Sequence, residues 1–331
     1  MGPISPMGPI GPMRGARPIL STRMSSPQPT TPMNGGPIKR VVILGCGFVG
    51  TRAARLFARA GWDVTGVTHS AASAARLAGE PFRALACDIT NAASLSAARE
   101  LHGADAVISA VSSGRGGEEA YREVYLRGLQ NAIARLNPGR VLFTSSTSVY
   151  AQTDGSWVTE GSPAEPLSAT SRVLREAEEA ALEQGGMAAR LAGIYGPGRS
   201  VLLRKFLEKR AVIEGDGGRH INQIHADDAA GALYYLVAGD LPAAIYNVAD
   251  DSPLTQLACY EWLAARLDQP LPPRGPVETN RKRGFTDKRV SNAKLRSLGW
   301  TLTYPSFQEA LTRDAELLAA ARADDSGDAR P

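Results

Sequence analysis

The sequence predicts an α/β fold in which a doubly wound parallel sheet is followed by a smaller carboxyl-terminal lobe. Three observations predict it. A continuous apolar run at residues 41–44 leads directly into a glycine-rich turn at residues 45–50. An amphipathic helix follows this turn, and a second apolar run begins at residue 63. Further apolar runs then alternate with helical patterns, which favours parallel strands with helices on both faces of the sheet.

The first strand and helix are the most clearly patterned elements. Residues 41–44 read VVIL, and a strand that is buried on both faces is expected to be apolar throughout. In the helix, Ala53, Leu56, Phe57 and Ala60 recur at the spacing of one helical face. Gly61 is placed to end this helix.

The turn between them reads GCGFVG, from Gly45 to Gly50. Gly45 permits the tight turn, Gly47 lets a pyrophosphate approach the backbone, and Gly50 lets the helix pack closely on the strand. The pyrophosphate would lie at the amino terminus of the helix, beside Phe48 and Val49, where free N–H groups and the helix dipole favour anions. In this strand–turn–helix context, the glycines predict a Rossmann-type domain that binds NAD or NADP.

The end of the second strand bears on the choice of cofactor. An acidic residue there bonds the ribose 2′-hydroxyl of NAD, whereas a basic group accepts the 2′-phosphate of NADP. Here the strand ends at Thr68, His69 and Ser70 and carries no acid. His69 with its neighbouring hydroxyls therefore favours NADP over NAD, and a solvated loop histidine is the alternative.

The later strands place more residues near the cofactor. Further strands are expected at residues 82–86, 104–110 and 140–145, with a helix over residues 121–136. In open α/β sheets, ligands bind beyond the carboxyl ends of the strands. This rule brings Asp88, Ile89, Ala110, Val111 and Ser146 around one crevice.

The charge argues against nucleic-acid or membrane partners. The net charge is +4, but Arg14, Arg17 and Arg23 supply three of these charges within the first 37 residues, leaving +1 for the remainder. No apolar run approaches the roughly 20 residues that span a bilayer. A small-molecule substrate is therefore the expected partner.

The cysteines and histidines give no reason to expect a metal. The three cysteines are far apart and form no CxxC pair, which excludes a cysteine-rich zinc site and indicates a reducing, cytoplasmic location. His220 and His225 lack the spacing of a metal-binding pair. We expect no metal site.

The chain divides by composition. Residues 1–37 hold nine of the 22 prolines and five of the six methionines, so we expect a disordered tail there. A transit peptide, or an over-extended start with the true start at Met24 or Met33, are the alternative interpretations. The nucleotide-binding domain is expected at 38–198 with a return segment at 219–250. The smaller lobe is expected at 199–218 and 251–320, with a frayed end at 321–331.

Four motifs together resemble a known family. They are GCGFVG at 45–50, TSSTSVY at 144–150, ARLAGIYGPG at 189–198 and INQIHADDAAGAL at 221–233. In this order and spacing they resemble the extended short-chain dehydrogenase/reductases, the NAD-dependent epimerase/dehydratase family. The resemblance runs from about residue 39 to residue 307. It implies an oxidoreductase, epimerase or dehydratase acting on a small carbonyl, alcohol or sugar-derived substrate, and a homodimer.

The resemblance also assigns roles to single residues. It implies that Ser146 hydrogen-bonds the substrate oxygen and that Asp88 contacts the adenine. The family's Tyr-x-x-x-Lys pair is missing, as in its atypical, YeeZ-like subgroup. Counting back from Glu176, Ser168 takes the Tyr position and Arg172 the Lys position.

This substitution leaves the acid–base chemistry open. A serine hydroxyl is a poor proton donor, and the pKa of an arginine is too high for a base, although Arg172 could hold ribose hydroxyls. Tyr195 is the first replacement candidate, with Tyr125 and Tyr150 behind it, and a packed aromatic is the alternative for each. Otherwise Ser146, Ser168, Arg172 and water catalyse the reaction.

Two further alternatives concern the function and the carboxyl-terminal charges. The protein could be a non-catalytic NAD(P)-binding regulator or sensor, or a non-redox isomerase or lyase with tightly held NAD. The basic residues at 281–283 and 288–289 are expected in a solvated loop, with a contact to a substrate phosphate or carboxylate as the alternative.

Overall fold

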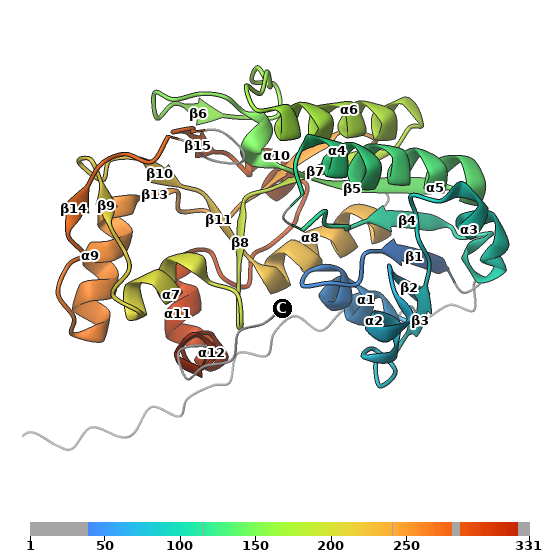
Figure 1. Cartoon of the computed structure of the whole chain (residues 1–331), viewed down its shortest axis with the longest axis horizontal. Helices are drawn as coiled ribbons and strands as arrows, with labels where there is room; N and C mark the ends of the chain where they lie inside the picture. Colours follow the sequence, from blue (N-terminus) through green and yellow to red (C-terminus); the bar gives the residue numbers. More distant parts are fainter. Residues whose placement is uncertain (1–38, 115, 240, 280–284, 324–331) are drawn as a thin grey trace, which may run out of the picture. The chain divides into compact units, whose positions relative to one another are not determined.

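The computed structural model describes residues 39–114, 116–239, 241–279 and 285–323 (Figure 1). The expected tail at 1–37 and the basic residues 281–283 lie outside the described residues. So does most of the segment 321–331, of which residues 321–323 end the last described helix.

A seven-stranded, wholly parallel sheet forms the centre of the fold, in the order β12-β7-β5-β4-β1-β2-β3. Its strands are β1 Arg40–Leu44, β2 Asp63–Thr68, β3 Arg83–Ala86, β4 Ala106–Ser109, β5 Arg140–Ser146, β7 Met187–Leu191 and β12 Ile245–Val248. The chain runs outward from β1 to β3 and then returns to β4 on the other side. The predicted doubly wound sheet is confirmed, and its switch point between β1 and β4 is where such sheets bind ligands.

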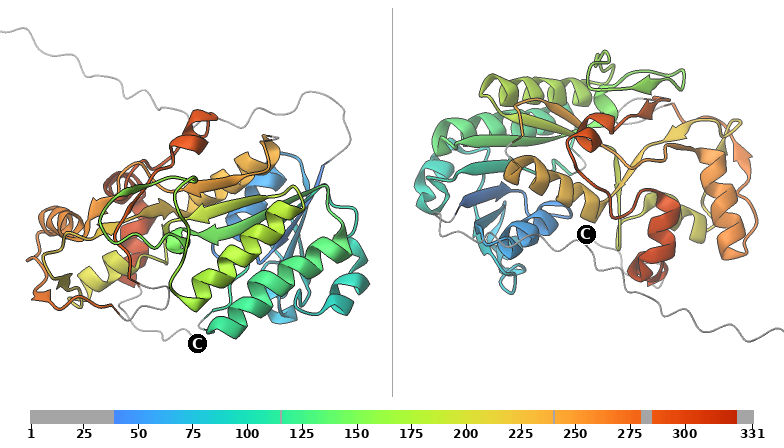
Figure 2. Two further views of the ribbon diagram at one scale, coloured as in Figure 1. Left: turned by 90° about the horizontal axis from the view of Figure 1, so that it is seen from above. Right: turned by 180° about the vertical axis from the view of Figure 1, so that it is seen from behind.

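Helices cover both faces of this sheet (Figure 1). On one face α1, Gly50–Arg59, packs against α8, Ala226–Ala238, with α2, Ala71–Ala75, beside β2 and β3. The other face carries α3, Ala92–Ala97, α5, Gly128–Leu136, and α6, Ala169–Glu183. The view from above in Figure 2 shows α5 and α6 side by side in front of the strands.

The helix predicted over residues 121–136 is longer and less regular than expected. It begins as α4, Glu118–Tyr121, passes through a π-helical turn at Arg122–Arg127, and continues as α5. Asn137 in the left-handed region ends it.

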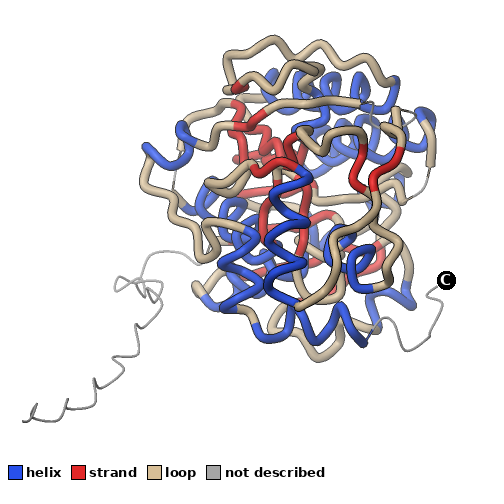
Figure 3. Tube along the Cα trace, turned by 90° about the vertical axis from the view of Figure 1, so that its left-hand side faces the viewer, coloured by secondary structure: helices blue, strands red, loops and turns tan. Residues whose placement is uncertain are grey.

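A second group of elements has an apolar core of its own, built around Leu203, Phe206, Tyr260, Leu263 and Phe307. Figure 3 looks onto this side of the chain and shows helices and short strands mixed. Its helices are α7 Val201–Leu207, α9 Gln256–Leu267, α11 Phe307–Arg313 and α12 Ala315–Ala323. Its strands β9 Ile213–Glu214 and β14 Arg274–Gly275 pair in parallel.

Short strand pairs and turns complete the description. The pairs are β8 Gly193–Tyr195 with β11 Gln223–His225, β10 His220–Ile221 with β13 Leu254–Thr255, and β6 Trp157–Val158 with β15 Arg289–Val290. Short 3-10 helices lie at Arg99–Leu101 and Thr147–Val149. The helix α10 spans Ala293–Ser297. None of the described helices is long and apolar enough to cross a bilayer.

Candidate active site

A cavity of about 1300 Å³ opens at the carboxyl ends of the strands. One side of it is built by the loops after β1 to β5 and after β7, and the other by residues of α7, α9 and the segments around β10 and β15. Small-molecule sites usually have volumes of roughly 300–1000 Å³. The cavity therefore has room for an extended ligand such as a dinucleotide together with a substrate.

The glycine loop forms the floor of this cavity. Gly45 has a φ of 92°, and its backbone N–H donates to Val67 O at 2.9 Å. A Cβ on Gly45 would come within 2.6 Å of Ala110 O, and one on Gly50 would overlap the carbonyl oxygen of Gly45. A Cβ on Gly47 would meet no atom within 4 Å. Packing therefore requires glycine at Gly45 and Gly50, whereas Gly47 faces open space.

The amino terminus of α1 fits an anion. Its N-cap is Val49, and no side chain caps the helix there. The first turn of α1 contains no acidic residue. Uncapped N–H groups and the helix dipole attract a pyrophosphate. Together with the open space at Gly47, these residues fit the dinucleotide that the sequence predicted.

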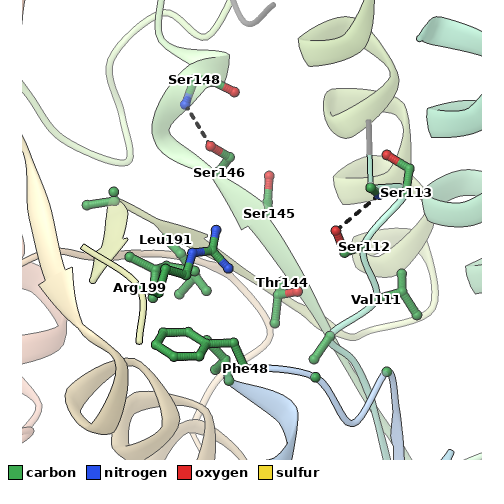
Figure 4. Close-up of a pocket in the computed structure, with 18 of the residues that line it drawn as sticks. Phe48, Val111, Ser112, Ser113, Thr144, Ser145, Ser146, Ser148, Leu191 and Arg199 are labelled. Atoms are coloured by element: carbon green, nitrogen blue, oxygen red, sulfur yellow. Dashed lines mark hydrogen bonds between the residues drawn. The ribbon is translucent and has the colours of Figure 1, made fainter. Parts of the chain in front are cut away.

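Phe48 and an arginine that the sequence analysis missed lie over this loop. The guanidinium carbon of Arg199 is 5.4 Å from the centre of the Phe48 ring, and that of Arg52 is 4.3 Å from it. Figure 4 shows the Arg199 side chain reaching into the cavity between Phe48 and the end of β5. Arg199 directly follows the GIYGPG motif, and this position in the sequence could have marked it as a residue of the site.

The far end of the cavity floor fits the adenosine part of a cofactor. Asp88 and Ile89 line it, and Asp88 Oδ1 is fixed by Thr90, whose N and Oγ1 donate at 3.0 and 2.8 Å. The His69 side chain is 81% exposed, with its Nδ1 3.8 Å from Asp88 Oδ1. Arg76, which the sequence analysis missed, also lines the cavity and donates to Ser73 Oγ at 2.8 Å.

Hydroxyl-bearing residues line the cavity beyond β4 and β5. Ala110 and Val111 form its wall beside Gly45, and Ala110 N donates to Leu44 O at 2.7 Å. Ser146 ends β5, is 9% exposed, and accepts a hydrogen bond from Ser148 N at 3.2 Å (Figure 4). The structure thus brings Ser146 to the same cavity as the glycine loop, as the sequence analysis expected.

Comparison with known proteins identifies the family. Residues 41–249 match the model of the NAD dependent epimerase/dehydratase family. The chain belongs to this family. Protein YeeZ of Escherichia coli (strain K12) is 30% identical over 284 residues, which cover 81% of this chain and 97% of YeeZ.

Solved structures agree with this assignment. A putative NAD-dependent epimerase/dehydratase from Methylobacillus flagellatus superposes with a TM-score of 0.70 at 27% identity, covering 86% of this chain and 100% of the other. A dTDP-glucose 4,6-dehydratase from Streptomyces venezuelae, solved with NAD and TYD bound, gives a TM-score of 0.71 at 23% identity, with 87% and 98% covered. The latter likeness supports the fold alone.

Two residues that the family resemblance assigned lie away from the cavity. Ser168 is the N-cap of α6, and its Oγ accepts from Ser171 N at 3.3 Å. Arg172 is exposed and donates to Leu167 O at 2.7 Å. Neither residue lines the cavity, whereas Leu174 does. Side chains two residues apart on a helix point about 200° away from each other. Because Leu174 faces the cavity, Arg172 points away from it.

The tyrosine candidates are packed. Tyr195 lines the cavity, but it is 2% exposed and packs edge-on against His225 and Phe307, with ring centres 5.3 Å from each. Burial raises the pKa of Tyr195 well above its ordinary value, so it is a poor proton donor near neutral pH. Tyr150 is fully buried and donates to Asn247 Oδ1 at 2.8 Å. Tyr125 lines the cavity and packs on Phe143.

The side of the cavity that α7 and the segments around β10 and β15 build forms a wall rich in basic side chains. Arg219, His220 and Lys288 line it, with Lys205 and Glu214. Lys288 is 4% exposed, so the solvated loop expected at residues 288–289 is wrong for this residue. Burial lowers the pKa of Lys288 to about 8. Among the described residues, no group of three or more His, Cys, Asp or Glu side chains could hold a metal ion.

Proposed function

We propose that this protein is an NAD(P)-dependent oxidoreductase, epimerase or dehydratase that acts on a small carbonyl, alcohol or sugar-derived substrate. One observation carries the proposal. A single cavity joins the anion-binding turn at Gly47, the hydroxyl of Ser146 and the cationic wall at Arg219. A bound nicotinamide would supply the hydride chemistry, and Ser146 would orient the substrate oxygen.

The cationic wall supports an anionic or highly polar substrate. The side of the cavity built by the segments around β10 and β15 is bordered by Arg219, His220 and Lys288. Positive charges that are held together in a cavity favour ligands with phosphate or carboxylate groups. The dehydratase from Streptomyces venezuelae that shares the fold is named for dTDP-glucose, a sugar nucleotide whose diphosphate carries negative charge.

We further propose that NADP is the preferred cofactor. An acid at the end of β2, which would bond the 2′-hydroxyl of NAD, is replaced by His69. Arg76 lines the same end of the cavity and is tied to Ser73. A guanidinium and a hydroxyl suit a ribose 2′-phosphate.

The alternative is a nucleotide-binding regulator or sensor without catalysis. The positions of Ser168 and Arg172 outside the cavity and the buried hydroxyl of Tyr195 support it. Turnover linked to the cofactor and abolished by Ser146→Ala would contradict this alternative.

The first test is a fluorescence titration of the purified protein with NADPH and NADH in parallel. We expect both nucleotides to bind, NADPH at least tenfold more tightly. Gly47→Asp is the control, because a Cβ there meets no protein atom within 4 Å and the added carboxylate would face the pyrophosphate. We expect this variant to keep its unfolding midpoint and to lose binding. Absence of binding to the wild type, with no nucleotide co-purifying, would refute the proposed function.

A further inference from the structure

Lys288 lies in an unusual position for a lysine. Its side chain is 4% exposed, yet it lines the large cavity, at the end of the segment that leads into β15. Buried lysines are rare because an ammonium group loses its hydration. A lysine held in this way is therefore a candidate for chemistry.

Asn222 holds the backbone of Lys288 in place. Asn222 Nδ2 donates to Lys288 O at 2.8 Å, and Val290 N donates to Asn222 Oδ1 at 2.7 Å. The pairing of β15 with β6 fixes the next residue, because Arg289 is in register with Trp157. Lys288 thus projects from a braced segment.

The same asparagine connects Lys288 to the strand beside Ser146. Asn222 O accepts from Gly193 N at 3.0 Å, and Gly193 lies two residues beyond the end of β7. The last residue of β7, Leu191, is the register partner of Ser146 on β5. Lys288 and Ser146 are therefore anchored to adjoining strand ends on the wall of one cavity.

The charges around Lys288 do not neutralise it. Lys288 Nζ donates to the neutral Thr286 Oγ1 at 2.7 Å. Asp287 is engaged elsewhere, because its Oδ1 accepts from His220 N at 2.9 Å and lies 2.8 Å from His220 Nδ1. Arg219, 3.9 Å from Glu214, adds a like charge nearby. Burial first, and Arg219 second, lower the pKa of Lys288, while Asp287 raises it.

The tyrosine and arginine candidates do not supply this chemistry. A general acid–base group works best when its pKa is near the operating pH. The pKa of Tyr195 is raised by burial, and arginine stays protonated. A lysine can exchange its proton near neutral pH when its surroundings disfavour the charge.

We propose that Lys288 Nζ is the proton donor and acceptor for the substrate oxygen. This inference rests on the proposed function. In the reducing direction Lys288 breaks an N–H bond and forms the O–H bond of the product alcohol, as the carbonyl carbon gains a hydride from the reduced nicotinamide, which is oxidised. In the oxidising direction the neutral amine of Lys288 takes the alcohol proton.

The first experiment measures the amine without any turnover. Trace acetylation of the full chain with acetic anhydride from pH 6 to 11, read by peptide mass spectrometry, compares Lys288 with the exposed Lys209, two residues after α7. We expect half-maximal reactivity of Lys288 near pH 8. A midpoint above pH 10, or no reaction of Lys288 at any pH, would overturn the proposal, because a proton donor must be reachable from the cavity.

The second experiment uses NADPH and 9,10-phenanthrenequinone as a carbonyl probe. General acid–base groups contribute roughly 10²–10⁴-fold. We expect Lys288→Met and Lys288→Arg each to lower kcat at least 100-fold, with the NADPH Kd within twofold of wild type, and Lys209→Met to change neither. In the wild type, kcat for reduction should fall as the pH rises through 8, because the protonated amine is the donor.

The outcomes separate the two proposals. If Lys288→Arg keeps wild-type turnover, Lys288 supplies charge alone, and the acid–base role is refuted. If the wild type binds NADPH but does not reduce the quinone, the oxidoreductase part of the proposed function fails, whatever the acetylation midpoint of Lys288. If turnover is normal but the midpoint lies above pH 10, the role of Lys288 fails and the proposed function stands.

Discussion

Residues of one type have different structural roles at neighbouring positions of the cofactor site. A side chain at Gly45 or Gly50 would strike backbone atoms, whereas one at Gly47 would enter the cavity. Among the arginines, Arg52 is tied to Asp227 at 3.0 Å on the surface, while Arg76 lines the cavity. Position relative to the cavity therefore decides which substitutions change binding and which change stability.

Arg76 provides the sharpest test of cofactor choice. If it meets the 2′-phosphate, Arg76→Ala should weaken NADPH binding about tenfold, equal to about 1.4 kcal/mol, and leave the NADH Kd within twofold. Parallel fluorescence titrations measure both. Arg83→Ala is the matched control, because Arg83 is exposed on β3 and does not line the cavity. An equal loss for both nucleotides would show that Arg76 acts on the shared part of the cofactor.

The cofactor half of the site could be predicted from sequence because its residues follow one another in local motifs. Gly47, Asp88, Ala110 and Ser146 each end or follow an apolar strand, and the strand ends meet at one edge of the sheet. Lys288 could not be predicted, since its basic run resembles a solvated loop. Its burial depends on contacts with Asn222, 66 residues away.

At the scale of elements, a buried ion pair fixes α6 beneath the site. Glu178 is fully buried, and its Oε2 accepts from Arg190 Nη2 of β7 at 2.7 Å. Its Oε1 accepts from Ser145 Oγ of β5 at 2.5 Å, one residue before Ser146. The pair therefore holds α6, β5 and β7 in one arrangement. Ser168 and Arg172 lie at the start of the same helix, and neither lines the cavity.

Breaking this pair should be costly. Glu178→Gln leaves the Arg190 guanidinium buried without its counter-charge, so we expect a loss of about 3 kcal/mol of unfolding free energy in urea titrations. Glu179→Gln is the control. Glu179 is 57% exposed and pairs with Arg175 on the same helix, which is worth at most about 0.5 kcal/mol. A loss below 1 kcal/mol for Glu178→Gln would mean that the pair does not brace α6.

At the scale of the whole described chain, one carboxylate joins the two apolar cores. Asp228 lies on α8, which packs on the main sheet, and is 3% exposed. Its two oxygens accept from Thr303 N at 2.6 Å and Tyr304 N at 2.9 Å, just before α11. The parallel sheet could be predicted from its apolar runs. This junction could not, because strands of two or three residues and single long-range hydrogen bonds leave no periodic pattern.

The junction makes stability depend on pH in a defined direction. Burial raises the pKa of Asp228 from 3.8 to about 6, so the folded chain holds a proton there that the unfolded chain has released. The bound proton stabilises the folded chain. This stabilisation is fully present below pH 3.8, the pKa of Asp228 in the unfolded chain, and is lost as the pH rises through 6. Between pH 4.5 and 7.5 the loss is about 2 kcal/mol.

The comparison of variants isolates this term. The asparagine of Asp228→Asn cannot titrate, so the variant does not lose this stabilisation. Relative to wild type, the unfolding free energy of Asp228→Asn should therefore rise by about 2 kcal/mol between pH 4.5 and 7.5. Urea unfolding at the two pH values measures it. Asp227→Asn, whose carboxylate is 55% exposed beside Arg52, is the control and should show no shift of this size. A difference that stays constant with pH would show that Asp228 is ionised throughout, with its two backbone hydrogen bonds outweighing the cost of burial.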